Sequence, residues 1–511
     1  MRQTFQEYNK KANKPRGTGF TACAQKLFFC LALIAVLLAM GVGCAVGPDY
    51  KPPETKAPEQ WDGQSVVTPA HPSKTAPEPV TLVEWWNAFN DPTISSLVEM
   101  ALRSNLDLRQ AEARIRQARA SRGVAGAPLL PQVDATALYQ KSQGSSEAAG
   151  GGAIATVGGV QKLFQVGLDA SWEIDVFGGT RRSIEAATAD LRAAVEDRRD
   201  VLIILAGDVG TNYFNLRGFQ QQIAIARKNL EAQKKTAQIT HKRFAAGFIS
   251  RLDVANADAQ VSTTEAQIPF LESQARSAIY NLGVLLGKQP AVLEKDLAIT
   301  APIPTTPPEI PVGLPSDLVR RRPDIRRAEA RIHAATARIG VATADLFPRF
   351  NLTGSLGISA NDLTRVGNVS SSKFWSFSPS VTWPVFAGGR IYWNIKLQDA
   401  LQEETLAAYE KTVLIALKDV ETALVAYAKE QERYRSLAEA VINNRKAVDL
   451  AMKLYVAGKT DFLNVLTAQR SLYTNEDALT QSTRTLATNL VALYKALGGG
   501  WEKTNYTPPG G

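Results

Sequence analysis

Residues that could carry out chemistry are few in this 511-residue chain, and they lie far apart. The three histidines, His71, His241 and His333, occupy unrelated stretches. Two of the three cysteines fall within the first 43 residues, so the rest of the chain keeps Cys44 alone and has no disulfide framework or thiolate metal site. The glycine-rich stretch 150–159 lies in an expected hairpin loop, not between a strand and a helix as a phosphate loop would. We therefore expect no enzyme activity and no cofactor.

The N-terminal segment carries an export signal instead. Six basic residues within the first 26 are followed by the apolar run LFFCLALIAVLLAMGVGCAV. This order is typical of a secretory signal, although a retained membrane anchor is the alternative because the run approaches the ~20 residues that span a bilayer. Gly41-Val42-Gly43 match the bacterial lipoprotein processing sequence in part. We predict a signal peptide over 1–43 and a covalent lipid (palmitate) on Cys44.

Charge and proline content characterise the chain after the signal. The formal net charge is +9, and removing 1–43 takes away six basic residues and one acid, which leaves an ordinary balance with no reason to expect nucleic acid. Eight prolines lie within 48–79 and the stretch has little periodicity. We interpret 44–91 as an extended, lipid-anchored N-terminal arm.

The chain also contains an internal repeat. The pentapeptide AEARI occurs at 111–115 and again at 328–332, and further matches follow at separations of 217 and then 211 residues. A period near 200 indicates a duplicated half-domain. We predict repeat 1 over 92–300, a Pro-rich linker over 301–315 and repeat 2 over 316–500, with a tail over 501–511.

Four segments alternate apolar and polar residues with a period of two, as β-strands do: 133–139, 164–176, 350–358 and 375–385. They form two expected hairpins, about 132–176 and 349–386, and most are near the 9–11 residues that a membrane strand needs. A soluble sheet is the alternative. Four strands cannot close a barrel, and an open edge has no hydrogen-bond partner in lipid, so a membrane barrel must be shared between chains. These considerations do not choose three chains over two.

Long helices form the rest of each repeat. Eight apolar residues follow a seven-residue period from 195 to 244, and eight more do so from 406 to 455. Sustained heptads indicate supercoiled helices of roughly 95 Å, which suit a long tube or, alternatively, a fibrous coiled coil. We predict long helix pairs at about 180–287 and 390–497, each turning at a glycine, Gly247 or Gly458.

Nine stretches follow one another in a recognisable order: CAVGPDYKPP (44–53), WWNAFNDPTISSLVEMAL (85–102), LPQV (130–133), WEIDVFGGTRR (172–182), RFAAG (243–247), RRPDIRRAEARI (321–332), LFPRF (346–350), WPVFAGGR (383–390) and YVAGKTDFLNVLTAQ (455–469). Together they resemble the TolC-like outer-membrane efflux family, specifically its lipidated, NodT-like branch.

The resemblance implies a mainly α fold with membrane β: a homotrimer whose long coiled-coil helices form an α-helical barrel joined to a 12-stranded β-barrel, four strands per chain. It implies a lipid-anchored protein of the cell outer membrane, in contact with outer-membrane lipid and extending into the periplasm. It further implies a passive duct for multidrug efflux of small toxic compounds, docked to a periplasmic adaptor (membrane-fusion) protein and an inner-membrane RND-type pump.

The resemblance also places the closed end of the tube at the helix turns. We expect the gate residues to be Leu463, Asn464, Thr467 and Asp253. Thr467 stands where the family has an aspartate, so we hypothesise a gate that attracts cations less than usual. A capped helix start is the alternative role for Asn464 and Thr467. The expected adaptor-docking residues of the turns are Gly247, Leu252, Gly458 and Asp461.

Two other functions stay open from the sequence. The same architecture can serve as an outer-membrane duct for protein secretion, and a structural lipoprotein without a pore could share the lipid signal and the heptads. The sequence of the duct does not identify the transported substrate, because the pump selects it.

Overall fold

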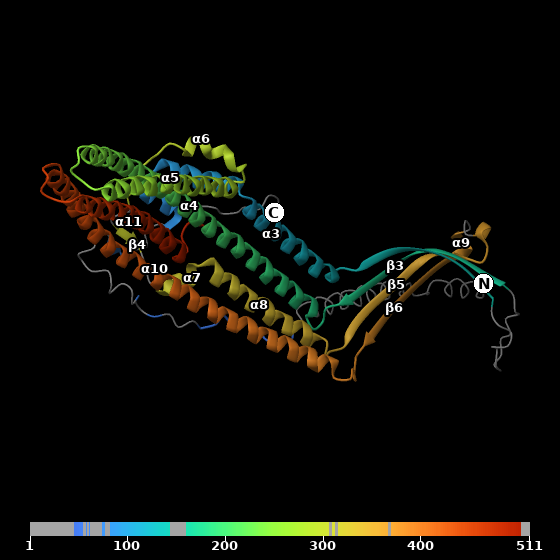
Figure 1. Ribbon diagram of the computed structural model, residues 1–511. Coiled ribbons are helices and arrows are strands. Elements are labelled where there is room, and N and C mark those ends of the chain that lie inside the picture. The colour runs from blue at the N-terminus through green and yellow to red at the C-terminus, as the bar shows by residue number, and fades with distance from the viewer. Residues whose placement is uncertain are drawn as a thin grey trace, which may run out of the picture. The chain divides into compact units, whose positions relative to one another are not determined.

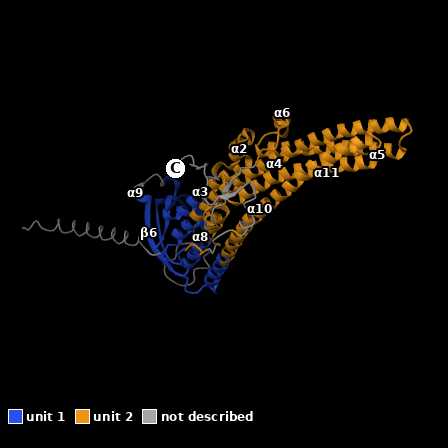
Figure 2. Ribbon diagram, turned by 90° about the vertical axis from the view of Figure 1, so that its left-hand side faces the viewer, with its two compact units in different colours: residues 1–50, 121–187, 334–402 blue, residues 51–120, 188–333, 403–511 orange. Residues whose placement is uncertain are grey.

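The computed structural model describes residues 45–54, 58, 61, 74–76, 82–143, 160–305, 309–311, 315–365 and 369–501. They fall into two compact units, coloured separately in Figure 2. Unit 1 takes its described residues from 45–50, 121–187 and 334–402, and it contains the four long strands. Unit 2 covers the described parts of 51–120, 188–333 and 403–511 and is mainly helical. No helix in the described part of the chain is both long and apolar enough to cross a membrane.

The four predicted strands form one antiparallel sheet in unit 1, in the order β2-β3-β5-β6 (Figure 1). Their bounds are β2 Gln132–Gln143, β3 Val160–Ile174, β5 Arg349–Ala360 and β6 Lys373–Thr382. The two hairpins are far apart in sequence but pair directly along β3 and β5. In the described part of the chain, the outer edges of β2 and β6 have no neighbouring strand. The sheet is therefore open at both sides, as a shared barrel requires.

The register places one chemistry on each face of this sheet. Tyr139 lies opposite Phe164, Leu168 opposite Leu356, and Leu356 opposite Trp375, so one apolar face continues across all four strands. The other face pairs polar residues, for example Thr136 beside Asp169 and Ser355 beside Ser376, whose side chains hydrogen-bond at 2.8 and 2.7 Å. A sheet with one apolar and one polar face suits a wall between lipid and water.

The helices repeat as the sequence does. The long helices α4 (Gly179–Ala245) and α10 (Arg390–Val456) have 67 residues each, and the returning helices α5 (Arg251–Leu285) and α11 (Phe462–Ala496) have 35 each. The remaining helices are α2 (Pro92–Ser104), α3 (Leu106–Gly126), η4 (Ala127–Leu129), η5 (Pro290–Leu293), α6 (Glu294–Leu297), α7 (Pro315–Arg321), α8 (Pro323–Ala344), η6 (Leu363–Arg365) and α9 (Val369–Ser372). The heptads thus form long helices as predicted.

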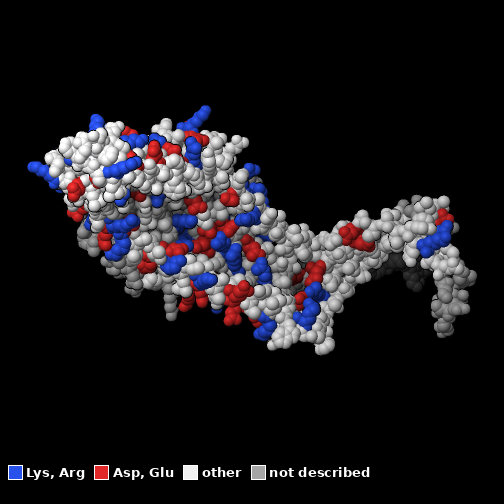
Figure 3. Space-filling view, in the orientation of Figure 1, with Lys and Arg blue, Asp and Glu red and all other residues white. Residues whose placement is uncertain are grey.

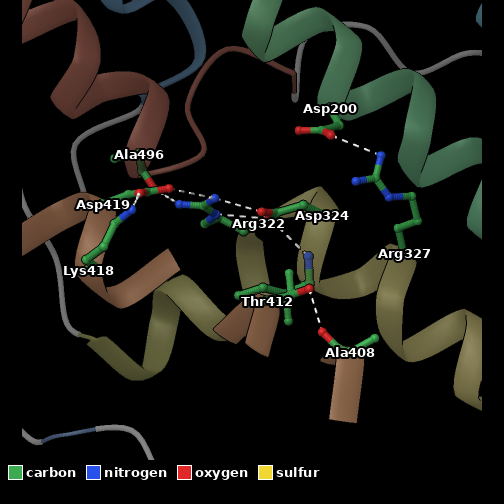
Figure 4. Close-up of polar contacts among 10 residues, drawn as sticks. Asp200, Arg322, Asp324, Arg327, Ala408, Thr412, Lys418, Asp419 and Ala496 are labelled. Carbon is green, nitrogen blue, oxygen red and sulfur yellow. Dashed lines mark hydrogen bonds and ion pairs between the residues drawn. The ribbon is translucent and has the colours of Figure 1, made fainter. Parts of the chain in front are cut away.

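The two repeats close the same junction with different side chains. In repeat 1, the Asn105 amide donates to the Leu285 carbonyl oxygen at 2.9 Å. At the matching place in repeat 2, the Arg322 guanidinium donates to the Ala496 carbonyl oxygen at 3.0 Å (Figure 4). Each junction follows the end of a returning helix, where a carbonyl lacks an intrahelical partner. The duplication therefore keeps the hydrogen bond while the donor differs.

The predicted arm and linker are more structured than expected. Residues 82–89 of the arm form the helix η3 (Leu82–Phe89), and its Trp85, Trp86 and Phe89 are buried in unit 2. Trp85 stacks on Tyr494 at 5.3 Å between ring centroids. Earlier in the arm, β1 (Lys74–Ala76) pairs in parallel with β4 (Glu309–Pro311) of the linker. Burial of the three large aromatic side chains of η3 explains why the chain folds there despite the prolines upstream. The signal peptide 1–43, Cys44 and the tail beyond 501 lie outside the described residues.

Candidate functional site

The two helix turns that the family resemblance assigns to partner docking share one backbone geometry. Gly247 and Gly458 both have a left-handed φ, +78° and +72°. At each turn the residue after the glycine donates its amide to a carbonyl five residues back, Phe248 to Arg243 and Lys459 to Leu454, both at 2.9 Å. This is the Schellman ending of a helix, which favours glycine. No atom lies within 4 Å of a Cβ added at Gly247, so its φ, not crowding, requires glycine.

The returning helices begin differently in the two repeats. Ser250 and Asp253 form a capping box, with the Asp253 amide 3.3 Å from the Ser250 hydroxyl and the Ser250 amide 3.2 Å from the Asp253 carboxylate. Asp461 holds the matching backbone position before α11, but its side chain accepts no capping hydrogen bond. Asp253 is therefore engaged in holding its own helix, whereas the Asp461 carboxylate is left for other contacts.

The three α11 residues expected at the gate share the exposed side of the helix start. Leu463 is 61% exposed, and Asn464 and Thr467 are also exposed. Asn464 donates its side-chain amide to the Thr460 hydroxyl at 2.8 Å. Leu252, at the other turn, is 68% exposed. In one chain these side chains have no packing role, so they are available to face other chains or a lumen.

Beneath the turns, an apolar cluster ties all four long helices together. It consists of Ala237, Ala257, Tyr455, Phe462, Val465 and Leu466. The guanidinium of Arg243 lies 4.6 Å from the centroid of the Tyr455 ring and donates to the Tyr455 carbonyl oxygen. Arg243 thus joins the end of α4 to the end of α10 through a cation–π contact and a hydrogen bond. Both residues fall within the family motifs, but nothing in the sequence pairs them.

Above that cluster, a polar seam runs between α4 and α11. Its α4 members, Gln222, Asn229 and Thr236, are spaced by seven residues. Their side chains meet Asp477 at 2.6 Å, Glu476 at 2.9 Å and Gln469 at 2.9 Å respectively. Buried polar pairs in a coiled coil fix register at a cost in stability. The sequence does not reveal the seam, because the matching apolar heptad lies one residue away and dominates the pattern.

The buried carboxylate of the seam has an exposed counterpart in repeat 1. Arg445 donates to Glu476 at 2.7 Å, and the Glu476 side chain is only 5% exposed. At the equivalent positions, Lys234 and Glu265 lie 3.6 Å apart with 42% and 61% of their side chains exposed. The carboxylate of this pair is therefore buried in repeat 2 and exposed in repeat 1, while the basic side chain is exposed in both. The inner packing of α11 explains the difference, since many more of its residues are buried than of α5.

A second polar cluster surrounds Arg322 in unit 2 (Figure 4). Its guanidinium donates to Asp324 at 2.7 Å and lies 3.6 Å from Asp419, beside a cavity of about 480 Å³. Burial opposes the charged form of Arg322, but these carboxylates raise its pKa above the ordinary value. Burial raises the pKa of Asp200, and Arg327 at 3.0 Å partly offsets this. In the described part of the chain no group of three or more His, Cys, Asp or Glu residues is arranged to hold a metal.

The segment that follows Cys44 occupies a seat in unit 1. The Val46 amide donates to the Phe177 carbonyl oxygen at 3.1 Å. Arg182, whose side chain is 6% exposed, donates to the Val46 carbonyl oxygen at 3.1 Å and to Asp49 at 2.7 Å. A Cβ added at Gly47 would lie 2.5 Å from the backbone of Gly340, so only glycine fits there. This seat, defined by Arg182 and Gly340, holds the chain from Val46 onward, which is two residues after the predicted lipid site.

Comparisons with known proteins cover most of the chain. A family profile described as "Outer membrane efflux protein" matches residues 97–288 and 314–499. The pyoverdine export outer membrane protein OpmQ of Pseudomonas aeruginosa is 34% identical over 475 residues, which cover 92% of this chain and 97% of that protein. The toluene efflux pump outer membrane protein TtgI of Pseudomonas putida is 32% identical, with 91% and 97% covered.

A solved structure agrees with these matches. The outer-membrane channel OprN superposes with a TM-score of 0.82 at 38% identity, covering 90% of this chain and all of that one. The open two-faced sheet and the two 67-residue helices of this chain both belong to the fold that it shares with that channel. The chain therefore belongs to the outer membrane efflux protein family and is a TolC-like efflux channel of the outer membrane.

Proposed function

We propose that three copies of this chain form a passive duct that carries small toxic compounds across the periplasm and the outer membrane. The observation that carries the proposal is the open four-stranded sheet with one apolar and one polar face. Three such sheets would supply twelve strands and leave no edge in lipid. The duct performs no reaction on its cargo, so we expect no enzymatic activity.

The partners we propose are a periplasmic adaptor and an RND-type pump of the inner membrane. The two Schellman turns, one in each repeat, would present similar exposed surfaces to an adaptor. Leu252 is exposed at the first turn, and the Asp461 side chain makes no capping hydrogen bond at the second. An adaptor that contacts both would meet similar geometry six times around a trimer. The pump would supply the energy, and it would also select the substrate.

The cargo class follows from relatives and from the duct's polar face. OpmQ is named for export of pyoverdine and TtgI for efflux of toluene, so one architecture serves both a polar and an apolar small molecule. A lumen lined by small Ser, Thr and Asn side chains, as on the polar face of β5 and β6, would bind neither kind strongly. We therefore propose small organic toxicants as the cargo, with no narrow preference set by the duct.

For the gate we propose Leu463, Asn464 and Thr467, with Asp253 near them. The exposure of the three α11 side chains supports this assignment, because a lumen-facing residue has no packing partner in its own chain. The capping box holds the Asp253 side chain at the start of α5. Because Thr467 is uncharged where the family resemblance implies an aspartate, the gate would attract cations less than usual.

For the N-terminus we propose a covalent lipid on Cys44. The seat supports it, because hydrogen bonds to Val46 and Asp49 hold the chain in unit 1 just after the predicted lipid site. Cys44→Ala should abolish acyl labelling of the mature protein, whereas Arg182→Ala should keep the label and expose residues 45–54 to protease. Unlabelled wild-type protein would rule out the lipid.

Deletion of the gene in its own host tests the export function. We expect greater susceptibility to several unrelated toxic compounds, restored by the wild-type gene. A variant that removes the seam charge, such as Glu476→Gln, serves as a partial-function control. Unchanged susceptibility to every compound, together with a defect in a secreted protein, would favour the protein-secretion duct instead; unchanged behaviour in both respects would favour a structural lipoprotein.

A further inference from the structure

Three lysines stand on the apolar, lipid-facing side of the sheet at its loop end. Lys141 lies two residues before the end of β2, and Lys162 lies two residues after the start of β3. Lys373 is the first residue of β6 and pairs with Ile358 of β5, so it is level with Val166 of β3. All three are exposed. By strand alternation they share the face of Tyr139, Phe164 and Trp375, not the polar face. We call these residues the lysine cluster.

Two members of the lysine cluster oppose each other directly. In the β2–β3 register, Lys141 pairs with Lys162, immediately beyond the pair Tyr139 and Phe164, whose rings lie 4.8 Å apart. Like charges at directly opposed positions destabilise an antiparallel pair. The pairing is therefore unfavourable for this chain by itself and becomes favourable where an anion lies between the two ammonium groups.

Carboxylates near the lysine cluster are too few or are otherwise engaged. The strand acids Asp134, Asp169 and Glu173 alternate onto the polar face. Asp362, after β5, accepts from the Thr364 amide at 3.0 Å and the Thr364 hydroxyl at 2.9 Å. Residues 144–159, outside the described part, contain one acid, Glu147, and no base. Figure 3 shows a mostly uncharged strand surface, with Lys or Arg and some Asp or Glu near its loop end.

The position of the lysine cluster along the strands matches a headgroup layer. The apolar side of β3 runs from Phe164 to Ile174, which at ~3.3 Å per residue and a tilt of about 45° spans roughly 25 Å, the height of a barrel's apolar band. Lys162 comes one outward-facing step beyond the aromatic pair that ends this band. The helices continue from the opposite end of the sheet, through β3 into α4. In an outer-membrane channel whose helices lie in the periplasm, the loop end meets the outer leaflet.

We propose that the lysine cluster is a binding site for the phosphate groups of the anionic glycolipid in the outer leaflet of the outer membrane. Lysine ammonium groups bind phosphate as point charges, and basic residues at a membrane surface attract anionic headgroups. The aromatic pair beside them contacts the first methylenes of the acyl chains. The bound phosphate would neutralise the opposed Lys141 and Lys162, and it would hold the ring of lipid against the channel.

The test uses the purified full-length protein in neutral detergent and bisphosphorylated lipid A as the probe, with bound lipid counted by native mass spectrometry. Wild type should bind this lipid more tightly than its dephosphorylated form. The triple variant K141Q/K162Q/K373Q should lose affinity by about fivefold per lysine removed. The matched control K396Q/K429Q/K453Q removes three exposed lysines that have carboxylate partners on α10, and it should bind as wild type does. Equal binding of the two lipids by wild type would overturn the proposal.

A second measurement keeps the proposal testable if the triple variant fails to assemble. The single variant Lys162→Gln relieves the like-charge pair, so it should melt about 1 °C above wild type in neutral detergent. Adding lipid A should stabilise wild type more than Lys162→Gln. A Lys162→Gln protein that melts lower in detergent and gains as much from the lipid would contradict the site. Millimolar inorganic phosphate should not displace the lipid; displacement would assign the site to a free anion instead.

Discussion

At the residue scale, the proposed gate lacks a charge at one position. Thr467 is exposed and uncharged where the family resemblance implies an aspartate, and Asp253 of the other turn belongs to the capping box of α5. An ionised ring at a narrow constriction attracts counter-ions strongly, because field lines focus in a low-dielectric opening. A threonine ring has no such field. The expected consequence is a duct whose closed end discriminates little between cations and anions.

Replacing that threonine should therefore change ion selectivity. Thr467→Asp should shift the reversal potential of single channels in a salt gradient toward the cation potential, and the shift should shrink as ionic strength rises. Thr412→Asp is the matched control, since Thr412 is a half-exposed threonine that lies on α10 far along the chain from the turn. Identical reversal potentials for Thr467→Asp and wild type would show that Thr467 does not line the gate.

At the scale of elements, the sequence predicts what has a period and misses what depends on distant partners. The strands and long helices are predictable because a two-faced strand and a heptad repeat leave local patterns. The polar seam pairs Asn229 with Glu476 and Thr236 with Gln469, which are more than 230 residues apart, and no local pattern reports that contact. The seat likewise joins Arg182 to Asp49, 133 residues away. The buried η3 escapes prediction because the prolines upstream of it indicate an extended arm, while its aromatic partners lie on other helices.

The contribution of the seam to the free energy of unfolding can be measured by making the same substitution in both repeats. Glu476→Gln removes a nearly buried charge that faces Arg445 and Asn229, and it should lower the free energy of unfolding by about 1–3 kcal/mol. Glu265→Gln makes the same change in the exposed pair of repeat 1, where the expected cost is about 0–1 kcal/mol. Denaturant unfolding of the purified protein compares them, and equal losses would show that burial in the seam contributes nothing.

At the scale of the whole molecule, duplication lets one chain supply two hairpins and two long helix pairs. The long and the returning helices have 67 and 35 residues in both repeats, but more residues of the returning helix are buried in repeat 2 than in repeat 1. Repeat 2 also nearly buries the Glu476 carboxylate, whereas the matching Glu265 of repeat 1 is exposed. A tube built from few chains thus contains two kinds of helix pair. Only the repeat 2 pair carries the proposed gate residues of α11.

The central claim is that the assembled chain is a conducting tube, and single-channel recording in planar bilayers tests it most directly. Crosslinking should first identify the trimer of the purified full-length protein. That trimer should insert into the bilayer and give uniform conductance steps. Thr467→Asp should change the ion selectivity of these steps without changing how often they occur. A folded trimer that inserts and never conducts, even after variants such as Arg243→Ala loosen the helix ends, would contradict the account and leave a structural lipoprotein.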